Sequence, residues 1–72
     1  MKMAWYDKKT DILNLELQEG KYWKSIELPN GMVVDVDMDG RMLSIEILKA
    51  RSAFGKDAKL ILGNVQKKEE TA

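Results

Sequence analysis

Apolar and polar residues alternate through the first two thirds of this 72-residue chain, with breaks at short, mostly glycine-containing turns. A period of two is typical of strands that bury one face and leave the other in water. Short turns connect strands that are antiparallel neighbours. We therefore predict a mainly β (α+β) fold, an antiparallel five-stranded meander with a short C-terminal helical segment packed on the sheet.

Asp39-Gly40 sets the register of the last two predicted strands. This pair fits a two-residue type I′ turn, because both central residues need positive φ. The turn places Val36 opposite Leu43 and Val34 opposite Ile45.

Pro29-Asn30-Gly31 fits a three-residue loop with glycine in the left-handed position, which pairs Leu28 with Met32 and Ile26 with Val34. A two-residue Asn30-Gly31 turn would turn every side chain to the wrong face.

Glu19-Gly20 is predicted to close a hairpin between the second and third strands, and the loop 7–11 to return Trp5 beside Leu13. All four turns agree on one buried face. Its predicted members are Met3, Trp5, Leu13, Leu15, Leu17, Tyr22, Ile26, Leu28, Met32, Val34, Val36, Leu43, Ile45 and Ile47.

After Leu48 the apolar spacing changes to three and four, which predicts short helices near 49–54 and 57–63. We expect one domain over residues 1–65. The charged segment 66–72 has no apolar anchor and is predicted to be a disordered tail.

The chain contains neither histidine nor cysteine. It therefore lacks the commonest general base and metal ligands, and its scattered glycines form no phosphate-binding loop. We expect no enzyme activity and no cofactor. No apolar run is long enough to cross a membrane, so we expect a cytoplasmic protein with no membrane partner.

One acidic string has the pattern of an EF-hand calcium loop: Asp35, Asp37, Asp39 and Gly40, followed by Glu46. Such a loop requires flanking helices, whereas these neighbours alternate like strands. We expect a solvated β-hairpin, and a weak divalent-cation site at the four carboxylates is the alternative. On the polar face of the predicted sheet, opposite the buried face, Glu27 and Glu46 are the candidates for an acid/base pair. Solvated charges are the ordinary arrangement on such a face.

Trp23 falls on the predicted polar face, where a large ring is costly to leave in water. With Met42, Ile12 and Leu48 it could form an apolar patch, for which cover by the C-terminal helix is slightly favoured over cover by another chain. The candidate partner-binding residues are Trp23, Met42, Phe54, Ile61 and Leu62.

Charge is unevenly divided, with six basic and nine acidic residues in 1–48 and six basic and three acidic residues in 49–72. This balance makes nucleic acid an improbable partner of the whole surface. Contact through Lys49, Arg51, Lys56 and Lys59 is the alternative. A domain of this size without disulfides often relies on self-association. We therefore expect a non-enzymatic interaction module that forms a homodimer, binds an unidentified protein, or both.

Two stretches carry a resemblance to a known family: Trp5-Tyr-Asp7 with residues 11–17, and Ser25-Ile-Glu-Leu28 with residues 31–50. Together they resemble the small prokaryotic family called domain of unknown function 2283, over roughly residues 1–53. The resemblance implies an antiparallel sheet finished by a short helix, with no catalytic residues to carry over. It also implies an antitoxin-like binding role, since some members look like the smaller partner encoded beside a toxin-like protein.

Overall fold

The computed structural model describes residues 2–67, which form one sheet with five antiparallel strands, a helical segment, and a short sixth strand after it. This confirms the predicted fold class. The strands are β1 (Met3–Asp7), β2 (Ile12–Glu16), β3 (Lys24–Glu27), β4 (Met32–Val36), β5 (Met42–Leu48) and β6 (Gln66–Lys67), and the helical segment contains α1 (Ala50–Phe54), the 3₁₀ turn η1 (Gly55–Asp57) and α2 (Ala58–Gly63).

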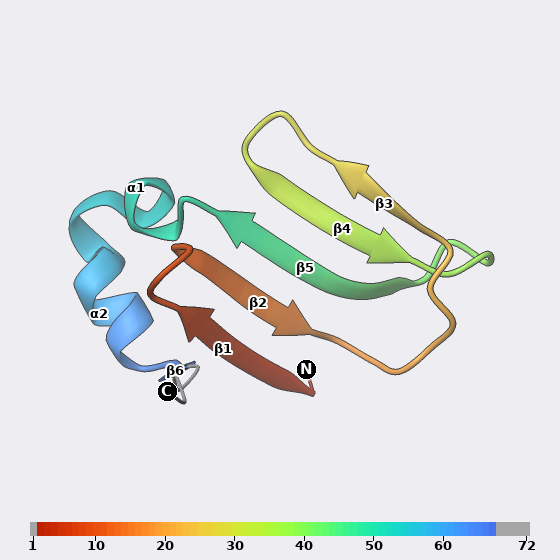
Figure 1. The fold of residues 1–72 in the computed structure, drawn as a ribbon, viewed down its shortest axis with the longest axis horizontal. Coiled ribbons are helices and arrows are strands. Elements are labelled where there is room, and N and C mark those ends of the chain that lie inside the picture. The colour runs from red at the N-terminus through yellow and green to blue at the C-terminus, as the bar shows by residue number, and fades with distance from the viewer. Residues whose placement is uncertain (1, 68–72) are drawn as a thin grey trace.

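The strand order across the sheet is β3-β4-β5-β2-β1-β6 (Figure 1). β2 therefore pairs with β5, and the predicted hairpin between β2 and β3 at Glu19-Gly20 does not form. The amides of Leu17 and Gln18, just after β2, donate hydrogen bonds to the carbonyl oxygen of Leu43. Beyond Gln18 the connection leaves the sheet. This order gives β5, the longest strand, neighbours on both sides and leaves β3 at one edge.

The predicted pairing within β3, β4 and β5 is correct over most of its length. Ile26 lies opposite Val34, and Val34 lies opposite Ile45. The amide of Leu28 donates to the carbonyl oxygen of Met32 at 2.8 Å, as the Pro29–Gly31 loop predicts. Gly31 has φ 86°, the left-handed conformation that this loop needs.

The turn between β4 and β5 is one residue longer than predicted. Asp37 and Arg41 close a three-residue loop in which Gly40 has φ 83°. Val36 consequently pairs with Met42 instead of Leu43, and a β-bulge beside Asp35 restores the predicted register. The Asp37 carboxylate explains the longer loop, because its Oδ1 accepts the amides of both Asp39 and Arg41 at 2.9 Å.

The pairing of β1 with β2 also differs by one residue from the prediction. Tyr6, not Trp5, lies opposite Leu13, and Trp5 lies opposite Asn14. The loop keeps four residues between Asp7 and Ile12, and Asp11 takes φ 58°. A one-residue slip exchanges the two faces, so Tyr6 enters the core and Trp5 joins the polar face.

The helical segment packs at the end of the sheet where β5 ends (Figure 1). The core cluster there contains Tyr6, Leu13, Ala50, Ala58 and Leu62, with Phe54 and Val65 packed against it. This confirms the apolar stripe predicted for the helices. Within residues 2–67, no helix is long and apolar enough to cross a membrane.

Two further expectations need correction. The segment 66–72 is predicted to be disordered, but Gln66–Lys67 form β6 parallel to β1, and 68–72 lie outside the described residues. Four of the predicted core residues are exposed. Met3 shares the face of Trp5, which the one-residue slip of β1 turns away from the core. Tyr22, Ile26 and Leu28 lie in or beside β3, which has no neighbouring strand on its outer side.

Candidate interaction surface

The three aspartates of the EF-hand-like string form hydrogen bonds and ion pairs with different partners. Asp35 Oδ1 accepts a hydrogen bond from Ser25 Oγ at 2.6 Å, and Asp35 Oδ2 accepts one from Ser44 Oγ at 2.8 Å. Glu46 lies on β5 opposite Asn14 of β2 and Val33 of β4. Among residues 2–67, no three acidic, histidine or cysteine side chains are grouped so that they could hold a metal ion.

Asp37 and Asp39 are both engaged with Arg41. Arg41 Nε lies 3.2 Å from Asp37 Oδ2, and Arg41 Nη2 lies 3.2 Å from Asp39 Oδ2. The hydrogen bond from the Arg41 amide is the largest cause that lowers the pKa of Asp37; burial opposes it, and the Asp39 amide and the Arg41 guanidinium add to the lowering. Asp37 is therefore a structural residue of the turn.

Ser25, Asp35 and Ser44 lie opposite one another on β3, β4 and β5 and form a polar row across the sheet. Tyr22 extends this row, because its hydroxyl lies 2.8 Å from Ser25 Oγ. The row thus ties the start of β3 to β4 and β5 through three side-chain hydrogen bonds. It holds β3 in place although β3 has only one neighbouring strand.

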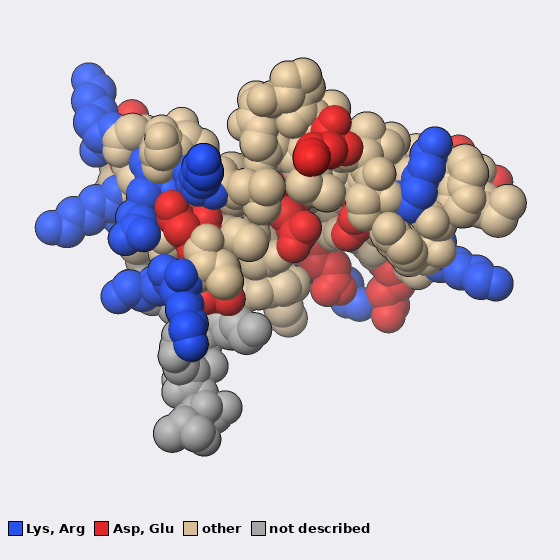
Figure 2. Space-filling model, turned by 45° about the horizontal axis from the view of Figure 1, so that its top comes forward, with Lys and Arg blue, Asp and Glu red and all other residues tan. Residues whose placement is uncertain are grey.

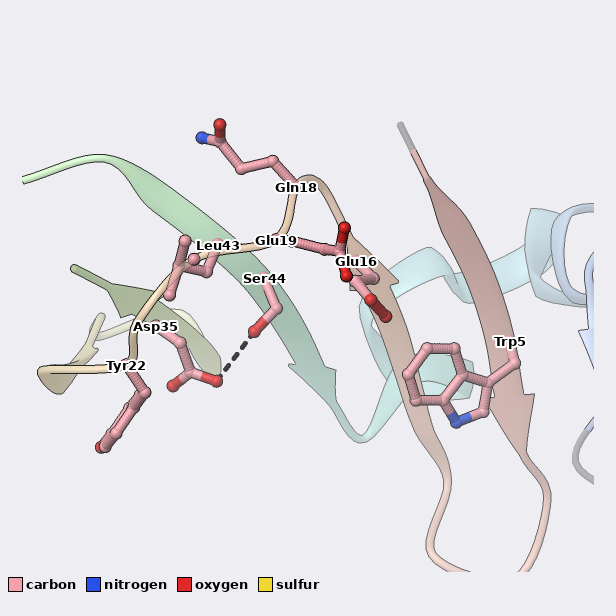
Figure 3. A pocket seen from close by; sticks show the side chains of 9 residues that line it. Trp5, Glu16, Gln18, Glu19, Tyr22, Asp35, Leu43 and Ser44 are labelled. Carbon is pink, nitrogen blue, oxygen red and sulfur yellow. Dashed lines mark hydrogen bonds between the residues drawn. The ribbon is translucent and has the colours of Figure 1, made fainter.

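A hollow of about 390 Å³ lies on this polar face, and Figure 3 shows the side chains around it. Trp5 and Glu16 project into it from β1 and β2, and Asp35 from β4. Its floor includes Leu43, the side chain displaced by the β-bulge. A β-carbon on Gly20 would lie 2.5 Å from Leu43 Cδ2, so the connection 17–23 passes directly over this leucine.

The candidate partner-binding residues fall into two groups. Trp23 and Met42 are each 49% exposed and lie at the same end of the sheet, on opposite sides of β4. The helical residues lie at the other end, where Leu62 is a core residue and Phe54 packs against the core. The helical segment therefore does not cover Trp23, which corrects the favoured expectation of intramolecular cover.

Trp23 belongs to a longer exposed stretch that sequence reasoning missed. Every residue from 21 to 30 is exposed, including all of β3. Four of the large exposed apolar side chains fall here: Tyr22, Trp23, Ile26 and Leu28. We call residues 21–30 the β3 edge segment. No local signal identifies it, because the alternation of β3 resembles that of a covered strand.

Basic side chains gather over the helical end of the molecule (Figure 2). Lys49, Lys56 and Lys59 are exposed there. Arg51 Nε lies 3.4 Å from Asp11 Oδ1, and this carboxylate also accepts hydrogen bonds from Tyr6 Oη at 2.5 Å and the Arg51 amide at 3.1 Å. Arg51 is thus part of a structural cluster, and nucleic-acid contact by this end stays a prediction.

Comparison with known proteins gives one match. A protein-family model, described as a protein of unknown function (DUF2283), matches residues 4–51, the part of the chain from β1 to the start of α1. Neither a curated protein nor a solved structure was found to match.

Proposed function

The chain belongs to the DUF2283 family of proteins of unknown function, and we propose that it acts as a non-enzymatic protein-interaction module. The observation that carries this proposal is the β3 edge segment, in which every residue is exposed. Tryptophan and tyrosine are enriched where proteins meet partners, and contiguous exposed apolar side chains mark interaction sites. The module binds a second copy of itself, a different protein, or both.

Two features of the chain support binding over catalysis. The sequence has no histidine and no cysteine, and the carboxylates of Asp35, Asp37 and Asp39 are bound by Ser25, Ser44, Arg41 and backbone amides. The Tyr22–Ser25–Asp35–Ser44 row holds the exposed strand in one conformation. A preorganised surface loses less conformational entropy when it binds.

The test compares the wild type with a variant whose exposed apolar side chains in this segment are replaced, Trp23→Ser with Ile26→Ser. Light scattering coupled to size exclusion, from micromolar to millimolar protein, measures self-association, and retention of host-lysate proteins on the immobilised chain measures partner binding. We expect association that the double variant loses. Leu60→Ser is the control, because Leu60 is 69% exposed on α2 at the other end of the molecule. A strict monomer that retains nothing overturns the proposal.

A further inference from the structure

The two edges of the sheet are treated differently by the fold. At one edge, β1 is paired with β6 through Trp5 and Tyr6. At the other edge, β3 pairs with β4 alone, and all four of its residues are exposed. An unpaired edge presents free backbone donors and acceptors, which makes it a template for another strand.

The register shows which backbone groups of β3 are free. Leu28 donates its amide to Met32 of β4, and Ile26 lies opposite Val34. Backbone groups of an antiparallel strand point alternately to its two sides. The amides and carbonyls of Ile26 and Leu28 therefore point toward β4, and those of Ser25 and Glu27 point away from the sheet. β3 also contains no proline and no bulge that would block an incoming strand.

We propose that β3 pairs antiparallel with β3 of a second copy, about a two-fold axis at Ile26. This deepens the proposed function, on which it rests, by naming the partner and the mode of contact. In this register Ser25 and Glu27 of one copy form the hydrogen-bonded pairs with Glu27 of the partner subunit and Ser25 of the partner subunit. Ile26 faces Ile26 of the partner subunit, and Lys24 faces Leu28 of the partner subunit.

Charge and apolar contact favour this register over its two neighbours. A two-fold axis at Glu27 would place like charges directly opposite each other, which is destabilising. An axis at Ser25 would place Lys24 opposite Ile26 of the partner subunit, so that no two apolar side chains of β3 would face each other. The axis at Ile26 instead joins two isoleucines, so that the apolar row of Ile26, Val34 and Ile45 continues from one sheet into the next. Lys24 is accommodated at the edge, with its Nζ 4.5 Å from the centre of the Trp23 ring.

The size of the core argues that the occupant is a second copy. None of the large side chains in the described part of the chain is fully buried, and domains this small commonly gain stability from oligomerisation. The formal net charge is zero, so two copies approach without net repulsion. Pairing between the β3 strands of two copies would cover Ile26 and Leu28 in both copies.

The first experiment uses cysteine cross-linking, for which the natural absence of cysteine is an advantage. Residues facing each other in a non-hydrogen-bonded antiparallel pair have Cα atoms about 4.5 Å apart, within reach of a disulfide. We expect Ile26→Cys to give a covalent dimer under mild oxidation with copper phenanthroline. Lys24→Cys lies on the same strand and face, but its two copies would be about 13 Å apart along the strands. It should remain uncrosslinked, as should Leu60→Cys.

The second experiment removes the outward amide by Glu27→Pro and compares it with Glu27→Ala, which keeps the amide. Sedimentation equilibrium measures the dimer dissociation constant, and circular dichroism verifies the fold. The proline removes one interchain hydrogen bond from each copy, so we expect dimerisation to weaken about tenfold or more. The alanine variant should stay within about threefold of the wild type, because it loses no interchain bond.

The outcomes separate the two proposals. A dimer in which Ile26→Cys does not cross-link, or cross-links no faster than Lys24→Cys, overturns β3 pairing and leaves the proposed function standing. Monomers that bind a different protein through Trp23 and Ile26 likewise overturn β3 pairing alone. Monomers that bind nothing overturn both. If Glu27→Pro does not fold, the cross-linking comparison decides.

Discussion

Replacing Tyr6 by phenylalanine tests the cluster that joins the turn between β1 and β2 to the start of α1. The Tyr6 hydroxyl donates to Asp11 Oδ1 at 2.5 Å, and Tyr6 is 4% exposed. The same carboxylate accepts the Arg51 amide, and the Asp11 carbonyl oxygen accepts the Ala50 amide at 2.9 Å. Tyr6→Phe removes the hydroxyl while keeping the ring that fills the core.

The magnitude follows from the chemistry of the lost bond. A hydrogen bond to a charged group contributes about 1.5–3 kcal/mol to the free energy of unfolding. Asp11 keeps both contacts to Arg51 and its side chain is 19% exposed, so water can replace part of the lost bond. We expect Tyr6→Phe to destabilise the fold by about 1.5–2 kcal/mol at pH 7. In a domain of this size that lowers Tm by about 10 °C.

The pH dependence of the difference gives an independent check. Burial tends to raise the pKa of Asp11, but the Tyr6 hydroxyl and the Arg51 amide and guanidinium outweigh it and lower the pKa. A lowered carboxyl pKa contributes stability above the ordinary value and loses it as pH falls through the folded-state value. The difference between wild type and Tyr6→Phe should therefore shrink in acid. Burial, followed by the bond to Asp11, raises the pKa of Tyr6, so its contribution is present below the ordinary tyrosine pKa and is lost as pH rises through the folded-state value.

The assay is urea unfolding followed by circular dichroism, at one protein concentration because association would shift the midpoint. Tyr22→Phe is the matched control, since its hydroxyl bonds to Ser25 at 2.8 Å but the residue is 59% exposed. We expect that variant to stay within about 0.5 kcal/mol of the wild type. Equal effects of the two substitutions, or a Tyr6→Phe difference that persists unchanged in acid, would refute the reasoning.

Three further predictions concern the acidic hairpin. Gly40→Ala should destabilise the fold by about 1 kcal/mol in thermal unfolding, because Gly40 has φ 83°, a conformation that is unfavourable for alanine. Gly63→Ala is the control: Gly63 is in the last turn of α2 with open space around its α-carbon, so this variant should be neutral or stabilising. Asp37→Asn should make the free energy of unfolding fall less steeply as pH decreases. The pKa of Asp37 is lowered, so its contribution to stability is present above the ordinary carboxyl pKa and is lost as pH falls through the folded-state pKa. If urea unfolding shows the same fall in acid for wild type and variant, this prediction is wrong. Millimolar calcium should leave Tm and the amide chemical shifts of 35–46 unchanged, because Asp35, Asp37 and Asp39 already have partners and no three acidic side chains of residues 2–67 are grouped to hold a metal ion. A saturable shift of either would show a cation site.

Short-range patterns predicted much of the local structure. The loop at Pro29–Gly31 and the pairing of Ile26 with Val34 depend on residues within a few positions of each other. The helical stripe of Phe54, Ala58 and Leu62 is local as well, and it packs as its spacing predicts. The predicted pairing of Val34 with Ile45 is also correct, because the bulge beside Asp35 offsets the longer turn.

The lengths and conformations of two turns could not be predicted from residue type, because they depend on the conformation or the hydrogen bonds of a single aspartate in the loop. Asp37 accepts two amides of its own loop and lengthens it by one residue, which sends Leu43 to the polar face. Asp11 takes a positive φ, and with the four-residue loop this exchanges Trp5 for Tyr6 in the core. Either shift moves a side chain by one residue, and one residue is enough to change its face.

The sequence by itself determined the first five strands, the helical end and most of the register of the last two hairpins, because these depend on contacts between neighbours in the chain. Only the tertiary structure decided that β5 lies beside β2 and that β3 is left at an edge. The second and third strands could have paired through Glu19-Gly20, and choosing between these arrangements requires comparing the burial of whole strands. That choice exposed residues 21–30, and with them the surface that we propose binds a second copy.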